Sequence, residues 1–585
     1  MSATDESTEQ GEGGQPPSRK PPAWQKPAKR YGPIVVVVVL IAAAVALFGG
    51  GGGGDDDDSA STDAGTTDEL VASGPMTWQK AEATGEDVDW GPNCDTTTGR
   101  IKLVSVYAPP CVEPFTGDNG GATYAGVTAD EIKIVQYIAD PDLDPLLTAT
   151  VAGAGAEINP ESAKQTIANF VTLYNHLFER YGRTVVVETY TGTGAGSDLE
   201  AAKADAIAIA EKQPFAVIGG PAQASPVFAA EIASHDIVCG PGCGVALPQD
   251  IVDQYKPYIW QAGPTPDQAT DLAAEAFGKL AGPGKAVLAG DDATKAKDRV
   301  YGLLHYDTPE GDHQIVFEHF KEALAENGID IATDVEFTLD LANAQENART
   351  NIAKLMDAGV TTIIYYGDPL TPSSLTREAT AQNYHPEWLL GPNALMDTTI
   401  FARLTDTSQW KNGFGTALVG ARGERSTNGA FQIHRWAFGE DPPNTNANVL
   451  EPPLRTMFTG IMLAGPNLTP DTFRDGLFRY PTSGGGPTEP QSSRGDHGVW
   501  PDEDWGGSDD TALIWFDPTA TGEDEVGNQG TGMYRYADMG KRYTIGNLPS
   551  SFDEAGLFDV GNSVTVYDQV PEEDTTPDYP PPDLG

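Results

Sequence analysis

The stretch TVVVETYTGTGAGSDLEAAKADAIAIAEKQPFAVIG, residues 184–219, decides the fold. It predicts a strand over 184–190, an alanine-rich helix over 199–212 and a second strand over 215–219. Apolar and β-branched residues fill both strands with few polar interruptions, which is typical of strands covered on both faces of a parallel sheet. Because parallel neighbours need a crossover connection, the helix between them predicts a β-α-β unit.

The same alternation continues on both sides of this unit. It includes strands and helices over 132–138, 161–181, 226–234 and 237–239, and it restarts over 266–280, 285–289, 314–327, 329–337, 344–358 and 361–366. We therefore expect an α/β fold class with two doubly wound parallel-sheet lobes joined by a multi-strand hinge, with an N-terminal membrane helix. Residues 480–530, rich in Gly, Asp, Pro and Trp, predict a long surface insertion.

Length and charge narrow the class of protein. The chain has 585 residues, which is too long for one ordinary domain. Apolar residues make up 39% of it, enough to exclude a wholly disordered chain. The formal net charge is −49, with 36 Lys and Arg against 85 Asp and Glu, and such a polyanion repels nucleic acid. We expect a folded body of two or three domains with no nucleic-acid partner.

An apolar run near the start of the chain predicts a membrane segment. Residues 34–48, IVVVVVLIAAAVALF, open an uncharged window that continues through glycines to residue 54. Aspartates 55–58 follow it, and the basic residues that precede it are Arg19, Lys20, Lys26, Lys29 and Arg30. The positive-inside rule then predicts a single pass at the cell membrane, with the N-terminus inside and the body extracellular. An uncleaved anchor is favoured, whereas cleavage near Ala46 would secrete the body.

Four cysteines in an exported chain predict disulfides. Cys94 and Cys111 flank a short segment, and Cys239 and Cys243 stand at the two ends of a tight Cys-Gly-Pro-Gly-Cys turn. We favour the pairing of Cys94 with Cys111 and of Cys239 with Cys243 among the three connectivities. A zinc site is the alternative, although the spacings lack paired Cys-x-x-Cys motifs.

Several short segments, in a fixed order, resemble one family of proteins. They are GVTADEIKI (126–134), FAVIGG (215–220) after Asp198 and an alanine-rich helix, residues 320–328, Gly391 and Pro392, MYRY (533–536) and GKRY (540–543). Over about residues 125–545 they resemble the extracellular substrate-binding proteins of ABC transporters, of the type 1, branched-chain amino acid binding kind. The resemblance implies two lobes that close on a small polar solute, with crossovers near 261–264, near 389–392 and after 450. It also implies permease subunits of an ABC transporter as partners.

These patterns together predict the order of segments along the chain. The expected segments are a cytoplasmic tail (1–33), a membrane segment (34–54), a flexible acidic linker (55–77), an N-terminal extension (78–127), lobe 1 (128–263), lobe 2 (264–389), a return to lobe 1 (390–475), an insertion with the C-terminal strands of lobe 2 (476–560) and a disordered acidic tail (561–585).

Ligands of doubly wound sheets bind beyond the carboxyl ends of the strands, where helix N-termini favour anionic groups. The loop after strand 215–219 is therefore expected to hold a ligand carboxylate, although Ser225 could equally be a plain helix cap. An aromatic and acidic pair at the end of the first strand could receive an ammonium group, and acids of the second lobe could face it. The candidate ligand-binding residues are Tyr137, Asp140, Ala222, Gln223, Ala224, Ser225, Gly240, Asp292, Tyr366 and Asp368.

No catalytic motif stands out. Residues 192–197 (GTGAGS) lie between a strand and a helix, but the third glycine comes one residue early for a dinucleotide loop. HExxH, GxSxG and Walker A motifs are absent from the sequence. We expect no enzyme, no catalytic residue, no cofactor and no metal, but a binding protein for an amino acid, an amide or a related small polar solute. The alternatives are a sensing or adhesion ectodomain on the same scaffold, or a hydrolase with a carbohydrate subsite at Trp500, Asp502, Asp504 and Trp505.

Overall fold

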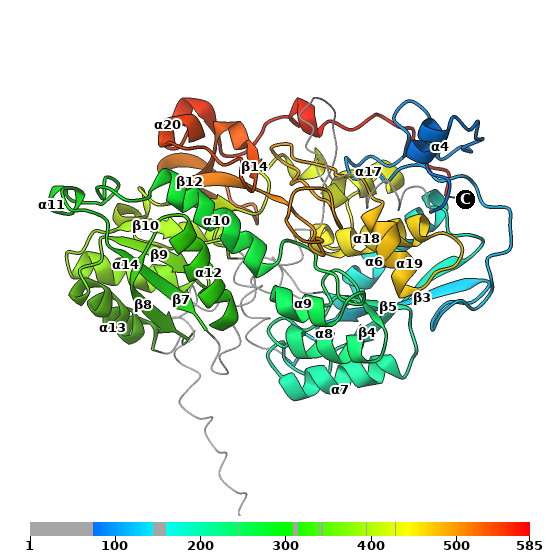
Figure 1. Cartoon of the computed structure of the whole chain (residues 1–585), viewed down its shortest axis with the longest axis horizontal. Helices are drawn as coiled ribbons and strands as arrows, with labels where there is room; N and C mark the ends of the chain where they lie inside the picture. The colour runs from blue at the N-terminus through cyan, green and yellow to red at the C-terminus, as the bar shows by residue number, and fades with distance from the viewer. Residues whose placement is uncertain are drawn as a thin grey trace, which may run out of the picture.

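The computed structural model describes residues 74–143, 159–244, 246–307, 314–338, 340, 343–393, 395–427 and 429–584. They form two α/β lobes that lie side by side (Figure 1). The predicted membrane segment, residues 34–54, lies outside the described residues. Among the helices of the described ranges, none is long and apolar enough to cross a bilayer.

Lobe 1 is built on a parallel sheet in the order β4-β3-β5-β6. Its strands are β3 (Glu131–Ile138), β4 (Thr184–Thr191), β5 (Ala216–Ile218) and β6 (Val238–Cys239). Its crossover helices are α6 (Pro160–Leu177), α7 (Leu199–Ala210) and α8 (Ser225–Ser234). α7 begins where the Asp198 side chain accepts the backbone N–H of Ala201, which is a typical N-cap. The β-α-β unit predicted from residues 184–219 is confirmed.

Lobe 2 is built on a nine-stranded mixed sheet. Its parallel part contains β7 (Tyr301–Tyr306), β8 (Ile331–Phe337), β9 (Thr362–Tyr366), β10 (Glu387–Leu390) and β11 (Phe414–Ala417). Its antiparallel part contains β12 (Asp510–Glu523), β13 (Gln529–Ala537), β14 (Arg542–Thr544) and β15 (Ser563–Val564). Its main helices are α10 (Pro266–Leu280), α12 (Gln314–Glu326), α13 (Ala344–Asp357) and α14 (Thr371–Ala381). The second lobe is therefore doubly wound in its parallel half only.

Two expectations about lobe 2 are wrong. Residues 285–289 form turns instead of a strand, and Val287 is 52% exposed although Ala286 and Ala289 are buried. Residues 480–530 are not a surface insertion, because β12 runs through the lobe 2 sheet and Trp505 before it is only 1% exposed. Gly and Asp mark tight turns as readily as loops on a surface, and here residues 504–509 are buried.

The chain passes between the lobes three times within the hinge. The first crossing is residues 261–265, the second is 418–427 after β11, and the third is 479–509 before β12. The first and third crossings are bonded to each other, since Gly507 donates its N–H to Gly263 at 3.0 Å. The second and third are also bonded, from the Ala421 N–H to the Pro487 carbonyl at 2.8 Å. Residues 390–417 belong to lobe 2, because β11 pairs with β10 and β12.

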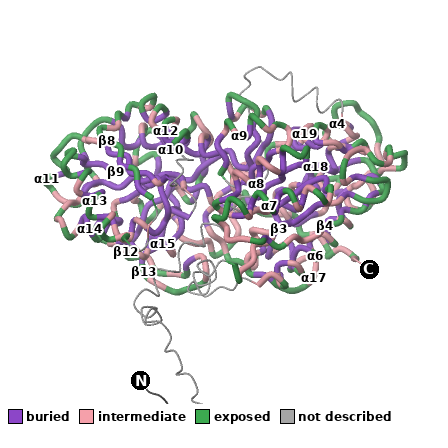
Figure 2. The backbone as a smooth tube through the Cα atoms, turned by 90° about the horizontal axis from the view of Figure 1, so that it is seen from below, coloured by how far each residue is buried: buried purple, intermediate pink, exposed green. Residues whose placement is uncertain are grey.

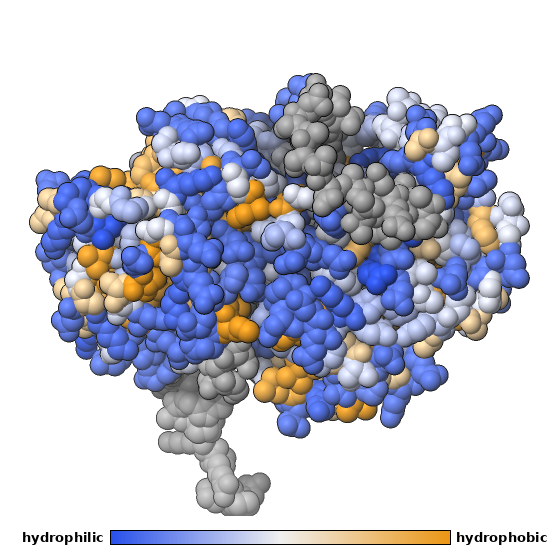
Figure 3. Space-filling view, viewed as in Figure 1, coloured by the Kyte–Doolittle hydropathy of each residue, from blue (hydrophilic) through white to orange (hydrophobic). Residues whose placement is uncertain are grey.

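Between the second and third crossings the chain completes lobe 1. The helices of this segment are α17 (Gly429–Phe438), α18 (Ala447–Ala464) and α19 (Pro470–Phe478). Phe458 of α18 and Phe473 of α19 share one apolar core with Phe170 of α6. Buried residues run through the middle of both lobes (Figure 2). The outer face shown in Figure 3 is mostly hydrophilic, as the charge of −49 requires.

The N-terminal extension packs onto lobe 1. It contains α4 (Trp78–Thr84), β1 (Cys94–Asp95) and β2 (Arg100–Ile101), and its Leu103 and Val112 join the lobe 1 core. A disulfide joins Cys94 to Cys111, and another joins Cys239 to Cys243. The predicted pairing is confirmed.

The last described residues, 565–584, form what we call the C-terminal strap. It leaves lobe 2 after β15 and crosses to lobe 1, where the red end of the chain reaches the blue extension (Figure 1). The Trp436 indole N–H donates to the Tyr579 carbonyl, and the Tyr579 hydroxyl donates to Asp95, each at 2.9 Å. Leu584 packs against the lobe 1 core. This segment was expected to be a disordered tail, but aromatic and aliphatic anchors among its prolines and acids hold it in place.

Candidate ligand-binding cavity between the lobes

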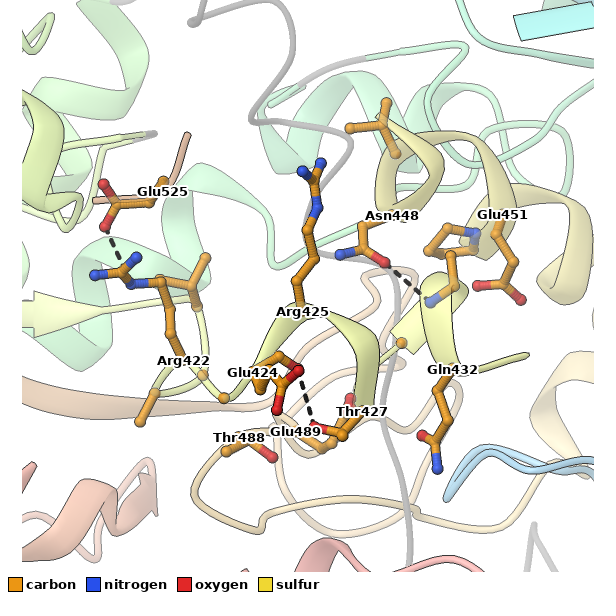
Figure 4. A pocket seen from close by; sticks show the side chains of 18 of the residues that line it. Arg422, Glu424, Arg425, Thr427, Gln432, Asn448, Glu451, Thr488, Glu489 and Glu525 are labelled. Carbon is orange, nitrogen blue, oxygen red and sulfur yellow. Dashed lines mark hydrogen bonds and ion pairs between the residues drawn. The ribbon is translucent and has the colours of Figure 1, made fainter. Parts of the chain in front are cut away.

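A cavity of about 1070 Å³ lies between the lobes (Figure 4). Lobe 2 contributes the segment after β10 and the β12–β13 hairpin, and lobe 1 contributes the first turns of α6, α17 and α18. The second and third crossings, the extension and the C-terminal strap complete the lining. Pockets of about 300–1,000 Å³ bind drug-sized ligands, so this cavity has room for a whole small solute.

The lining is acidic. Its acidic residues are Asp397, Glu424, Glu451, Glu489, Glu523, Asp524, Glu525, Asp568 and Asp574, and its basic residues are Arg422, Arg425 and Arg455. Arg422 lies 3.4 Å from Glu525, whose oxygens also accept the backbone N–H groups of Thr399 and Ile400 at 2.9 Å. Figure 4 shows Arg422 reaching toward Glu525, while Arg425 extends away from both.

The other two arginines are held on the lobe 1 side. The Arg455 Nε lies 2.8 Å from Glu451, and both side chains are buried. Burial alone would lower the pKa of Arg455, but the neighbouring Glu451 carboxylate outweighs it and raises that pKa above its usual value. Arg425 stacks over the Phe431 ring at 4.3 Å and donates to the Thr445 carbonyl, and burial lowers its pKa.

Asp397 is a buried acid among the lining residues. The residue is only 5% exposed, and its Oδ2 accepts the backbone N–H groups of Leu418 and Val419 at 3.1 and 3.3 Å. Its buried Oδ1 has no hydrogen-bond partner among the described residues. Burial raises the pKa of Asp397 to about 6, against the effect of the backbone hydrogen bonds. A buried acceptor left without a partner is costly.

Glu489 lines the cavity from the third crossing. Burial, with a contribution from the charge of Asp574, raises the pKa of Glu489 to about 8, so the group is mostly a neutral carboxylic acid at pH 7. Asp574 of the strap accepts both the backbone N–H and the hydroxyl of Thr488 at 2.7 Å. The strap is therefore fixed to the third crossing at the wall of the cavity.

The residues predicted in lobe 1 lie apart from this cavity. The Tyr137 hydroxyl bonds to Asp205 at 3.3 Å, and Asp140 accepts the N–H of Asp142 at 2.9 Å in the loop that follows. Ala222 is half-buried, Gln223 is exposed, and Ala224 and Ser225 are fully buried where α8 begins. Gly240 lies so close to α18 that a Cβ there would be 2.8 Å from the Met457 sulfur. None of these predicted residues is among those that line the cavity.

The residues predicted in lobe 2 also lie outside the cavity lining. Asp292 belongs to the four-residue helix α11 (Asp292–Lys295), at the far end of the lobe from lobe 1 (Figure 1). Tyr366 is buried at the end of β9, with its ring edge-on to Phe317. Asp368 is buried and accepts the N–H groups of Leu370 and Thr371 at 2.8 Å. Its hydrogen bonds therefore close the turn before α14.

The alternative carbohydrate subsite is not formed as an exposed platform. Trp505 is 1% exposed and stacks on Trp260 with ring centroids 4.5 Å apart, and Asp504 accepts from Gln268 at 2.7 Å. These groups pack the hinge.

Sequence reasoning missed the residues that line the cavity. Asp397 follows β10, so the rule of strand carboxyl ends could have found it. The segment GARGERST, residues 420–427, concentrates glycine and arginine between a strand and a helix, which is a usable signal for a polar site. Glu489 and Asp574 gave no signal, because only the tertiary fold brings them to the cavity.

The described residues thus form two α/β lobes, joined by three hydrogen-bonded crossings around a shared cavity. No family model and no curated protein matches the chain. The solved structures to which it is similar include substrate-binding proteins of ABC transporters.

One is the solute-binding protein from Rhodopseudomonas palustris HaA2 in complex with p-hydroxybenzoic acid, with 11% identity over 72% of this chain and 98% of that one, and a TM-score of 0.45. Another is a fatty acid substrate-binding protein from Thermomonospora curvata, with 16% identity over 73% and 96% of the two chains and a TM-score of 0.44. A third, from Desulfitobacterium hafniense in complex with Leu, shares 12% identity over 71% and 100%, with a TM-score of 0.41.

Proposed function

We propose that this chain is a solute-binding protein that captures a small amino-acid-like or amide ligand between its lobes and presents it to an ABC importer. The observation that carries the proposal is the cavity of about 1070 Å³, which residues of both lobes line. A ligand that touches both lobes stabilises their closed arrangement, because its contacts with the second lobe form only on closure.

Solute capture requires binding without a chemical step, with the three crossings as hinge. Polar groups on both sides of the cavity could fix the ends of one ligand, since Arg425 stands on the lobe 1 side and Asp397 on the lobe 2 side. A carboxylate placed near Arg425 and an amine near Asp397 would suit an amino-acid-like solute.

The test is a thermal-shift screen of the purified full chain against amino acids, amides, amines and aromatic carboxylates. A ligand that binds only the folded state raises the melting temperature with its concentration. Small-angle scattering should then show a smaller radius of gyration at saturation than without ligand. A folded chain that responds to none of these solutes would contradict the proposal.

We also propose that the body is held outside the cell by residues 34–54, with the N-terminus inside. The basic residues before this segment and the aspartates after it support the orientation. Protease added to intact cells should cut the body while an N-terminal epitope tag stays protected. Protection of both ends would overturn the proposed orientation.

A further inference from the structure

We propose that Asp504 and Asp509 form a carboxyl clip in the hinge, in which one proton shared by the two side chains holds the bend of the third crossing. Loss of this proton releases the bend and lets the lobes separate, so the hinge responds to pH. The clip belongs to the hinge and not to the cavity, and it goes beyond the proposed capture of a solute.

The first argument is position. Asp504 and Asp509 stand on either side of the point where the third crossing passes from lobe 1 to lobe 2. Directly after Asp504, Trp505 belongs to the apolar core of lobe 1. Asp509 directly precedes β12, which runs through the lobe 2 sheet. Four residues separate the pair, and two of them are glycines. A bond between the two side chains therefore fixes the direction in which the chain enters lobe 2.

The second argument is the hydrogen bonding of the two carboxyl groups, which are 2% and 0% exposed. Asp504 Oδ1 accepts from the Gln268 side chain at 2.7 Å and from the Gly506 N–H at 2.8 Å. Asp509 Oδ2 accepts the Ser493 hydroxyl at 2.8 Å. The two remaining oxygens, Asp504 Oδ2 and Asp509 Oδ1, are buried and receive no N–H or O–H group from the other described residues. Each carboxyl group thus has one oxygen held and one left over.

A shared proton satisfies the two remaining oxygens. The two carboxyl groups are hydrogen-bonded to each other, and such a bond needs a hydrogen on one of them, because ionised carboxylates only accept. Burial raises the pKa of both groups, and the charge of Asp504 raises that of Asp509 further. The folded chain therefore binds this proton more tightly than the unfolded chain does. The bond is present at low pH and is lost as the pH rises through the raised pKa.

The third argument is the balance of charge around the clip. Arg494 of the same crossing is 5% exposed, and its positive charge acts on both carboxyl groups. One carboxylate balances this cation, whereas two would leave a buried excess of negative charge, which is costly. The other charged or titratable groups that face the cluster are Tyr480 and His497 of the third crossing, Lys256 over the Trp505 ring, Arg455 of α18, Asp510 of β12 and Arg542 of β14, which pairs with Asp510.

The experiment measures the distance between the lobes of the full chain, without any solute, as the pH is raised from 5 to 9. The four native cysteines form two disulfides, so Glu200→Cys on α7 and Glu346→Cys on α13 supply two free thiols for a pair of pH-insensitive fluorescent dyes. Both positions are exposed, and each lobe carries one. We expect energy transfer between the dyes to fall as the pH rises. Constant energy transfer over the whole range would overturn the proposal.

The variants that test the clip are Asp504→Asn and Asp509→Asn, since an amide supplies a permanent N–H donor in place of the shared proton. We expect energy transfer in both to stay constant with pH, at the level of the unaltered chain at pH 5. Asp502→Asn is the matched control, because Asp502 is an exposed acid of the same crossing. D502N should keep the pH response of the unaltered chain. The same response in all three variants would contradict the clip.

Infrared difference spectra between pH 5 and pH 9 give a second readout. The band of a protonated carboxyl group that the clip contributes should be lost with rising pH in the unaltered chain and in D502N, and it should be missing from D504N and D509N. Glu489 remains in every variant, so any response that it causes persists in all of them. If these Asn variants show the same loss of band as the control, the clip holds no proton.

These outcomes are separate from those of the proposed function, because no solute is present. A hinge that does not respond to pH rejects the clip and leaves solute capture standing. A chain that binds no solute in the thermal-shift screen rejects solute capture and leaves the clip standing. Should one of the two Asn variants fail to fold, the other variant and the pH response of the unaltered chain still decide.

Discussion

At the residue scale, Arg183 shows how a buried cation can hold three segments together. It is 1% exposed, and its guanidinium donates to the carbonyls of Thr128 at 2.7 Å, Pro466 at 2.8 Å and Asn119 at 2.6 Å. Lysine cannot reproduce this planar fork. We expect Arg183→Lys to lower the free energy of unfolding by about 2–4 kcal/mol, measured by urea denaturation. The exposed Arg349→Lys should change it by less than about 0.5 kcal/mol.

A second residue-scale prediction concerns pH. The pKa of Glu489 is about 8 in the folded chain, above its ordinary value of 4.5, because of burial and the charge of Asp574. The folded state therefore binds this proton more tightly than the unfolded state does. The contribution of Glu489 to stability is greatest below pH 4.5 and is lost as the pH rises toward 8, at up to about 1.4 kcal/mol per pH unit.

Glu489→Gln should remove this loss. Urea denaturation at pH 5, 6.5, 8 and 9 measures the free energy of unfolding of both proteins. We expect the value for the variant to rise relative to that of the unaltered chain up to pH 8, and the difference to stay constant above pH 8. The other groups that act on Glu489 are Tyr107, Arg455 and Glu451, and they remain in both proteins. A difference that does not change with pH would show that Glu489 ionises in the folded chain as it does in the unfolded one.

The candidate site could be predicted only in part at this scale. Asp397 follows a strand that the pattern of lobe 2 did not reveal, since β10 is a strand of only four residues, Glu387–Leu390. The loop around Ser225 has the expected sequence, but Ala224 and Ser225 are fully buried, and Met457 of α18 lies against Gly240 in the following loop. Chain segments more than 200 residues apart decide this, and no local pattern reports it.

At the element scale, the helices α18 and α19 pack backbone against backbone. A Cβ on Gly476 would lie 2.6 Å from the Gly460 carbonyl oxygen and 2.7 Å from the Ala464 nitrogen. Both are backbone atoms, so neither can relieve the clash by a change of rotamer. We expect Gly476→Ala to lower the free energy of unfolding by about 1–3 kcal/mol. Gly423 has no atom within 4 Å of the corresponding position, so Gly423→Ala is the matched control and should be close to neutral. Equal effects of the two substitutions in urea denaturation would contradict this account of the packing.

Elements were predictable where a strand is buried on both faces and a helix follows it. The strands and helices of lobe 1 between Glu131 and Cys239 meet that condition. The antiparallel half of lobe 2 does not, because β12 alone is 14 residues long and its second half alternates between half-buried and exposed positions. In a segment rich in Gly and Asp, that pattern favours the prediction of a loop over that of a strand.

At the scale of the whole molecule, the C-terminal strap limits how far the lobes can separate. It joins lobe 2 at β15 to lobe 1 at Tyr579, and Asp574 fixes it to the third crossing. A chain ended at residue 570 loses the contacts of Asp574, Tyr579 and Leu584. We expect a lower melting temperature and, by small-angle scattering without ligand, a larger radius of gyration. If both values match those of the intact chain, the strap does not restrain the lobes.

The strap also adds a fourth passage of the chain between the lobes. With three crossings and the strap, the described chain passes between the lobes four times, so residues 74 and 584 both lie on lobe 1. Lobe 2 is thus a loop of chain whose two ends are both anchored in lobe 1. A pulling force applied between residues 74 and 584 acts on lobe 1 directly. Lobe 2 does not lie between the two points of attachment, so it does not carry that force. A pair of labels at those two ends travels together as the lobes close, so any sensor built from this protein needs one of its labels on lobe 2.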